Sequence, residues 1–135
     1  MSIEEINRFC RNSFIGFLGI EFLKFSDTIV EARMPVDQNK LQPMGVLHGG
    51  ASLALAETVA SAGSYLLVDE TKYNVFGLQV TGNHVSTVSS GDIIARAELI
   101  HRGNSTHVWD VDIESEDGRR ISVARVTNII IEKPY

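Results

Sequence analysis

A histidine and two glycines stand directly before an alanine-rich, apolar stretch, in the order Leu47, His48, Gly49, Gly50. Glycine allows other groups to approach the backbone closely, and the first N–H groups of a helix have no partner within that helix. These free donors, together with the positive end of the helix dipole, favour a carbonyl oxygen or an oxyanion. We therefore expect the Gly49 N–H to polarise a substrate carbonyl.

The stretch 51–67 predicts the helix that follows, and it carries one acidic residue, Glu57. Its remaining residues are small or apolar apart from a few neutral polar ones. A helix this apolar on all sides is normally buried, and a carboxylate is rarely buried without a partner or a purpose. Together with the flanking motif of His48, Gly49 and Gly50, the pattern favours a catalytic role for Glu57. The alternative is that Glu57 only pairs with a basic group of a neighbouring element.

The spacing of Gly49 and Glu57 predicts a shared site. Eight residues at roughly 1.5 Å per residue separate them by about 12 Å along the helix, whereas both must reach one substrate carbonyl. Two antiparallel helices from a symmetric dimer would bring Glu57 of one copy beside Gly49 of the other. The small residues that permit this close approach are Ala54, Ala56, Ala60, Ala62 and Gly63.

Residues along nearly the whole chain resemble the hotdog-fold acyl-CoA thioesterases. The glutamine six residues before His48 and the glutamate nine residues after it make the pattern specific. The branch that it resembles acts on aromatic substrates: 1,4-dihydroxy-2-naphthoyl-CoA hydrolases, phenylacetate-type thioesterases, and enzymes that clear aryl groups from siderophore carrier proteins. The matching residues are Gln42-Pro43, Gly45, Leu47-His48-Gly49-Gly50-Ala51, Leu55-Ala56-Glu57-Thr58, Ser61, Asn83-His84 and Val108-Trp109.

The resemblance implies hydrolysis of an acyl-CoA to the free acid and coenzyme A, without a cofactor or a metal. Gly49 and Gln42 would donate hydrogen bonds to the thioester oxygen. His48 would either contact the thioester or hold the loop before the helix. Glu57 would attack the carbonyl carbon to form a mixed anhydride, or take a proton from water as a general base, and both routes remain open.

Further residues are candidates for binding the substrate. Thr58 and Ser61 would face it, or else bond backward to helix carbonyls, and Ser61 could orient Glu57 or the attacking water. His84 is either a substrate contact or a core histidine. The strand face predicted for His84 also carries Phe76, Leu78, Val80 and Val88.

A basic residue beside a turn is the candidate for binding coenzyme A phosphate. Arg102 precedes the turn that contains Gly103, Ser105 and Thr106, although such turn arginines are usually solvated. His101 and His107 flank the same hairpin and are predicted to lie at the surface. The four histidines have no metal-ligand spacing, so we expect no metal site.

Composition predicts a single domain, residues 1–135, of a cytoplasmic protein. The net charge of −5 argues against nucleic-acid binding. Cys10 is the only cysteine, which excludes an internal disulfide, and no apolar run is long enough to span a membrane. We expect a homodimer with shared sites, and the resemblance implies that two dimers form a tetramer.

The order of predicted elements indicates an α+β hotdog domain, an antiparallel sheet wrapped around one long central helix. A capping box at Ser2 opens a first helix that ends near Phe14. Val36 to Met44 forms a polar loop before the central helix. The strands are predicted over residues 19–25, 28–35, 73–88, 92–102, 106–116 and 119–132, with turns at 26–27, 89–91, 103–105 and 116–118.

Two other functions are compatible with such a domain. A hotdog dehydratase or hydratase also uses a histidine and an acidic residue, but acts on β-hydroxyacyl groups. A non-enzymatic acyl-CoA-binding module would need no Glu57 carboxylate. The thioesterase pattern fits the motif better than either.

Overall fold

The central helix α3 (Gly49–Leu67) lies directly on the sheet because the residues that face the sheet are mostly small. In the computed structural model, which describes residues 1–134, a Cβ atom on Gly63 would lie 2.5 Å from Cη2 of Trp109. This packing leaves no room for a side chain at Gly63. The buried residues recur every three or four positions, as on one side of an α-helix: Ser52, Leu55, Ala56, Val59, Ala60, Gly63 and Ser64.

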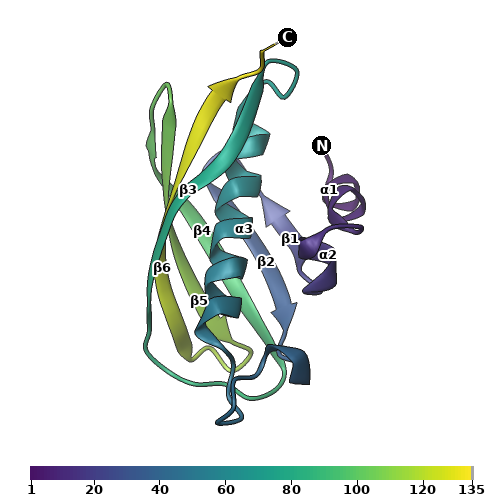
Figure 1. Ribbon diagram of the computed structural model, residues 1–135, viewed down its shortest axis with the longest axis vertical. Helices are drawn as coiled ribbons and strands as arrows, with labels where there is room; N and C mark the ends of the chain where they lie inside the picture. Colours follow the sequence, from purple (N-terminus) through teal and green to yellow (C-terminus); the bar gives the residue numbers. More distant parts are fainter. Residues whose placement is uncertain (135) are drawn as a thin grey trace.

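Six antiparallel strands form one sheet in the order β1-β2-β4-β5-β6-β3, and α3 crosses one of its faces (Figure 1). This arrangement confirms the predicted α+β fold. The bounds are β1 (Glu21–Phe25), β2 (Ile29–Pro35), β3 (Tyr73–His84), β4 (Asp92–Arg102), β5 (Thr106–Ser115) and β6 (Arg120–Glu132).

The N-terminal segment forms two helices where one was predicted. The capping box of Ser2 and Glu5 opens α1 (Ile3–Cys10) as expected. Ser13 then separates this helix from α2 (Phe14–Phe17): its hydroxyl donates to the Cys10 carbonyl and accepts from the Ile15 N–H. A serine side chain that satisfies both helix ends explains the break. The predicted polar loop before α3 contains a short 3-10 helix, η1 (Gln38–Lys40).

A β-bulge changes which side chains of β3 face the helix. Gly77 pairs with Asn128 and Val80 with Val126, and both β6 partners are buried. The ladder shifts between Gly77 and Gln79, which breaks the simple alternation of faces. The predicted shared face of His84 and Phe76 is therefore wrong. The strand also ends at His84 instead of at the predicted residue 88.

The two edges of the sheet differ in how they are protected. At β1, the Asn7 side chain donates to the Phe22 carbonyl and accepts from the Phe22 N–H, at 3.1 and 2.8 Å. At β3, the twelve-residue edge strand exposes Phe76 by 53% and Leu78 by 60%. A long edge with exposed apolar side chains favours pairing with another strand.

Candidate active site

The first turn of α3 leaves one backbone donor open. His48 is the N-cap: its Nδ1 accepts from the Gly50 N–H at 2.8 Å, and its carbonyl accepts from the Ala51 N–H at 2.9 Å. Within residues 1–134 the Gly49 N–H has no acceptor. The geometry therefore favours the loop-holding role of His48 and leaves Gly49 as the donor for a carbonyl oxygen.

His84 lies against Gly49. A Cβ atom at Gly49 would be 2.5 Å from Nε2 of His84, so only glycine allows this contact. Nδ1 of the same ring is hydrogen-bonded to the Ser122 hydroxyl at 2.7 Å. The resulting groove has a volume of about 290 Å³ and is lined by Gln42, Val46, Leu47, Gly49, Ser52, His84, Val85, Ser86, Thr87, Ile121 and Ser122.

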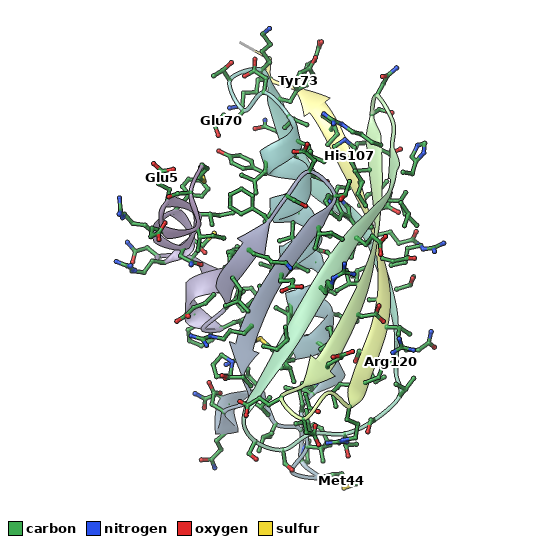
Figure 2. The ribbon with its side chains drawn as sticks, turned by 180° about the vertical axis from the view of Figure 1, so that it is seen from behind. Glu5, Met44, Glu70, Tyr73, His107 and Arg120 are labelled. Carbon is green, nitrogen blue, oxygen red and sulfur yellow. The ribbon has the colours of Figure 1, made fainter. Side chains whose placement is uncertain are left out.

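Gln42 is held with its amide nitrogen available. Its side-chain oxygen accepts from the Met44 N–H, in the loop at whose tip Met44 is labelled in Figure 2. Within residues 1–134, no group accepts a hydrogen bond from the Gln42 NH₂ group. That group can therefore act as a second donor beside the Gly49 N–H, as the sequence predicts.

Glu57 faces a second groove, between α3 and the N-terminal helices. A Cβ atom on Gly77 would lie 2.8 Å from the Glu57 carboxyl carbon, so the carboxylate lies over the β3 backbone at this glycine. The side chain is exposed, which corrects the predicted burial within one copy. None of the ion pairs among residues 1–134 includes Glu57, so the alternative of a structural salt bridge finds no partner there.

This second groove has a volume of about 390 Å³ and is mainly apolar. Phe9 stacks on Tyr65 at its rim, with ring centroids 6.0 Å apart. The sequence did not reveal the apolar wall of this groove because its residues come from five separate elements, α1, α2, β1, α3 and β3. The available signal was the spacing of Glu57, Ser61 and Tyr65, which are four residues apart and share one face of α3. The apolar residues that the prediction lacked are Phe9, Phe14, Ile15, Phe22, Tyr65 and Val75.

Thr58 and Ser61 both line the groove with Glu57, but their hydroxyl groups differ. Thr58 donates to the Ala54 carbonyl at 2.7 Å, which confirms the backward bond considered for it. Ser61 instead donates to Oδ1 of Asn128 at 3.2 Å, across to β6. Ser61 is therefore tied to the sheet, not to its own helix.

The two grooves lie apart in one copy, as the eight-residue spacing along α3 requires. The predicted phosphate contacts lie at the other end of the helix. Arg102 donates to the Leu67 carbonyl at 2.9 Å, and the Gly103 N–H bonds the Thr106 carbonyl at 2.8 Å to close the turn that also holds Ser105. Neither groove of the single chain includes these residues.

His107 is buried, which contradicts its predicted position at the surface. It is 2% exposed and bonded through Nδ1 to the Ser64 hydroxyl at 2.9 Å; Figure 2 labels its position. Burial lowers the pKa of His107, and the nearby positive charges of Arg102 and His101 lower it further. The predicted surface position is wrong because β5 turns His107 toward α3; of the two histidines beside this hairpin, His101 is exposed and His107 is buried.

The lowered pKa of His107 makes stability depend on pH. Below the ordinary pKa of about 6.5 the unfolded chain binds a proton that the folded chain resists, so stability should fall as the pH falls below 6.5. One proton gives a slope of at most about 1.4 kcal/mol per pH unit. Urea unfolding at fixed protein concentration between pH 7.5 and 5.5 measures it. His107→Gln should flatten the slope. The exposed control His101→Gln removes only the smallest of the three causes of the lowered pKa and should flatten it much less. An unchanged slope in His107→Gln would contradict the assignment.

Residues 1–134 lack both a metal-binding cluster and a helix able to span a membrane. No group of three or more His, Cys, Asp or Glu side chains in this part of the chain is arranged to hold a metal ion. Its helices include none that is both long and apolar enough to span a bilayer.

Comparison with known proteins decides the family. Residues 44–122 match the thioesterase superfamily, and this segment contains Gly49, Glu57 and His84. The chain belongs to the thioesterase superfamily. A crystal structure of a mutant thioesterase from Pseudomonas aeruginosa superposes on this thioesterase with a TM-score of 0.95. The two are 41% identical, and the match covers 98% of this chain and 96% of the other.

Two curated relatives of this thioesterase have named activities. The 1,4-dihydroxy-2-naphthoyl-CoA hydrolase of Escherichia coli is 37% identical over 97% of this chain and 96% of its own. A proofreading thioesterase of Cronobacter turicensis is 35% identical over 97% of this chain and 95% of its own. Together with the family match, these relatives confirm the predicted resemblance. The protein is a thioester hydrolase.

Proposed function

We propose that this thioesterase hydrolyses aromatic acyl-CoA thioesters to the free acid and coenzyme A. The observation that supports the proposal best is the groove beside Glu57, in which one carboxylate and two hydroxyl groups meet an apolar wall rich in phenylalanine and tyrosine. Aromatic rings pack favourably against such a wall. The named activity of the Escherichia coli relative is consistent with this substrate class.

The proposed working unit is a dimer joined through β3. In an antiparallel two-fold pairing of this edge strand centred between Val80 and Thr81, Gly77 of one copy lies opposite the partner's His84. Because Glu57 lies over Gly77 and Gly49 touches His84, the same pairing brings Glu57 beside the partner's Gly49. The open β3 edge and its exposed apolar residues support this assembly.

In the proposed reaction the thioester oxygen accepts from the Gly49 N–H and the Gln42 amide of one copy. This polarises the carbonyl carbon and stabilises the oxyanion that forms there. Glu57 of the other copy then either attacks the carbon or removes a proton from the attacking water. The thiolate of coenzyme A leaves in both routes, and water supplies the second oxygen of the acid.

The remaining parts of the proposal concern assembly and the coenzyme. Arg102 and the turn 103–106 are proposed to meet the coenzyme A phosphates at the surface. Two dimers are proposed to form a tetramer, in the cytoplasm, from chains that each form one domain over residues 1–135. No cofactor or metal is required for these steps.

A panel of acyl-CoA thioesters tests the proposed substrate class. Hydroxybenzoyl-CoA or hydroxynaphthoyl-CoA should have a kcat/KM roughly ten- to several-hundred-fold higher than hexanoyl-CoA or palmitoyl-CoA, because polar groups of the site stay unpaired beside an alkyl chain. His84→Ala should narrow this difference. Thiol release measures the rates. Equal or faster hydrolysis of the alkyl substrates would contradict the aryl assignment, and hydration of crotonyl-CoA would indicate a hydratase.

A further inference from the structure

A buried set of polar side chains lies behind Ser61, between α3 and the sheet. Ser64, His107 and Asn128 are each at most 2% exposed, and Trp109 is fully buried beside them. The Ser64 hydroxyl oxygen lies 2.9 Å from Nε1 of Trp109, 2.9 Å from Nδ2 of Asn128 and 2.9 Å from Nδ1 of His107. These contacts form one connected network.

The chemistry of each group fixes the direction of the bonds at Ser64. The Trp109 N–H and the Asn128 NH₂ group can only donate, so together they occupy both lone pairs of the Ser64 oxygen. Its single proton must then be donated to Nδ1 of His107. The lowered pKa of His107 favours the neutral ring, which has one nitrogen free to accept a hydrogen bond.

The orientation of Asn128 follows from the same reasoning. Its NH₂ group donates to two acceptors, the Ala60 carbonyl at 3.1 Å and the Ser64 oxygen at 2.9 Å. The amide oxygen must therefore face Ser61, and the Ser61 hydroxyl donates its one proton to it at 3.2 Å. With that proton engaged, Ser61 presents only lone pairs to the groove.

We propose that Asn128 is a positioning residue that fixes Ser61 as a hydrogen-bond acceptor for an O–H group bound in the groove beside Glu57. The inference rests on the proposed function, because it concerns the same groove. It adds a residue on β6 that does not line the groove itself and acts only through Ser61.

The consequence is a groove wall with two acceptors one helical turn apart. An ionised Glu57 can only accept, and Ser61 is restricted to accepting by Asn128. A water molecule that donates one hydrogen to each has a lone pair left for attack. A ring hydroxyl of the substrate is the other O–H group that could donate to Ser61.

NMR of the wild-type protein tests the orientation without any substitution. The two Asn128 side-chain amide protons should exchange slowly and show NOEs to Ser64 and Ala60 protons. The NOEs to Ser61 should be weaker. Stronger NOEs to Ser61 than to Ser64 would show the reversed amide and overturn the proposal.

Kinetics of Asn128 and Ser61 variants test the positioning role. Ser61→Ala should lower kcat/KM roughly fivefold to tenfold, the effect of one lost hydrogen bond, and Asn128→Ala should lower it similarly. The double variant should be no slower than Ser61→Ala, because both act through one hydroxyl. Asn128→Asp keeps an acceptor toward Ser61 and should retain more activity than Asn128→Ala. Additive losses, or a folded Asn128→Ala with wild-type kcat/KM, would contradict the proposal.

Val126→Ala is the matched control for destabilisation. Val126 is fully buried, apolar, and two residues from Asn128 on β6. Val126→Ala should lower Tm about as much as Asn128→Ala does, but it should leave kcat/KM unchanged. A loss of kcat/KM in Val126→Ala as large as that in Asn128→Ala would reduce Asn128 to a structural role.

Comparing substrates identifies the bound O–H group. If Ser61 holds the water, Ser61→Ala slows benzoyl-CoA and hydroxybenzoyl-CoA equally; if it holds the ring hydroxyl, only the second substrate is slowed. Both results support the acceptor role, whereas no loss with either substrate would contradict it. Failure of the wild-type protein to release thiol from either would refute the proposed function, and the NMR result would still decide the orientation of Asn128.

Discussion

Replacing Glu57 by glutamine is expected to lower kcat/KM by roughly three to four orders of magnitude while the protein stays folded. The amide has nearly the shape of the carboxylate, but it can neither attack a thioester carbon nor accept a proton from water. The fold should survive because the Glu57 side chain is exposed and has no ion pair among residues 1–134. Thiol release with hydroxybenzoyl-CoA and the Tm of both proteins measure the two effects.

Glu70→Gln provides a matched control. Glu70 is an exposed carboxylate that interacts with Tyr65 and raises the pKa of that phenol. Its replacement removes the same charge near the same groove, yet activity should stay within a few-fold of wild type. A Glu57→Gln protein with rates within tenfold of wild type would show that Glu57 is not the catalytic carboxylate.

Gly49→Pro is expected to produce the second largest loss, at least roughly a hundredfold, because it removes the open N–H donor. The helix itself should form, since proline is favoured at the first helical position, where no intrahelical bond is lost. His48 before it already has an extended backbone, φ −66° and ψ 131°, which suits a residue before proline. Circular dichroism checks the fold and thiol release measures the activity.

Gly49→Ala separates the two effects of the proline. Both residues add a Cβ atom where His84 lies 2.5 Å away, but alanine keeps the N–H. The loss in Gly49→Ala therefore reports the displacement of His84, and any greater loss in Gly49→Pro reports the donor. Equal rates in the two variants would argue that the N–H contributes nothing.

The sequence predicted the central helix and the order of helices and strands along the chain well, because the signals for these elements are local. Gly49 opens α3 as expected, and its buried stripe follows the small residues of 51–67. The eight-residue spacing of Gly49 and Glu57 was enough to indicate that one copy cannot join them. The rise of roughly 1.5 Å per helical residue, which separates the two residues by about 12 Å, is sufficient for this inference.

Other features depended on contacts between distant segments. The bulge at Gly77 reverses the face of Phe76, and no alternation pattern reveals such an insertion. His107 is buried because Ser64 and Asn128, far away in the sequence, provide its polar surroundings. The aromatic wall beside Glu57 likewise forms only when α1 and α2 pack beside α3. The spacing of residues along the sequence does not predict how these helices pack.

The most direct test of a site shared between two copies is a mixing experiment. Glu57→Ala chains and Gly49→Pro chains, each inactive alone, are mixed under conditions in which subunit exchange is demonstrated with tagged chains. A mixed dimer has one site with both native residues and one with neither, so random exchange should restore up to about a quarter of wild-type activity. No recovery from folded, exchanging chains would contradict the account and place each complete site within one copy.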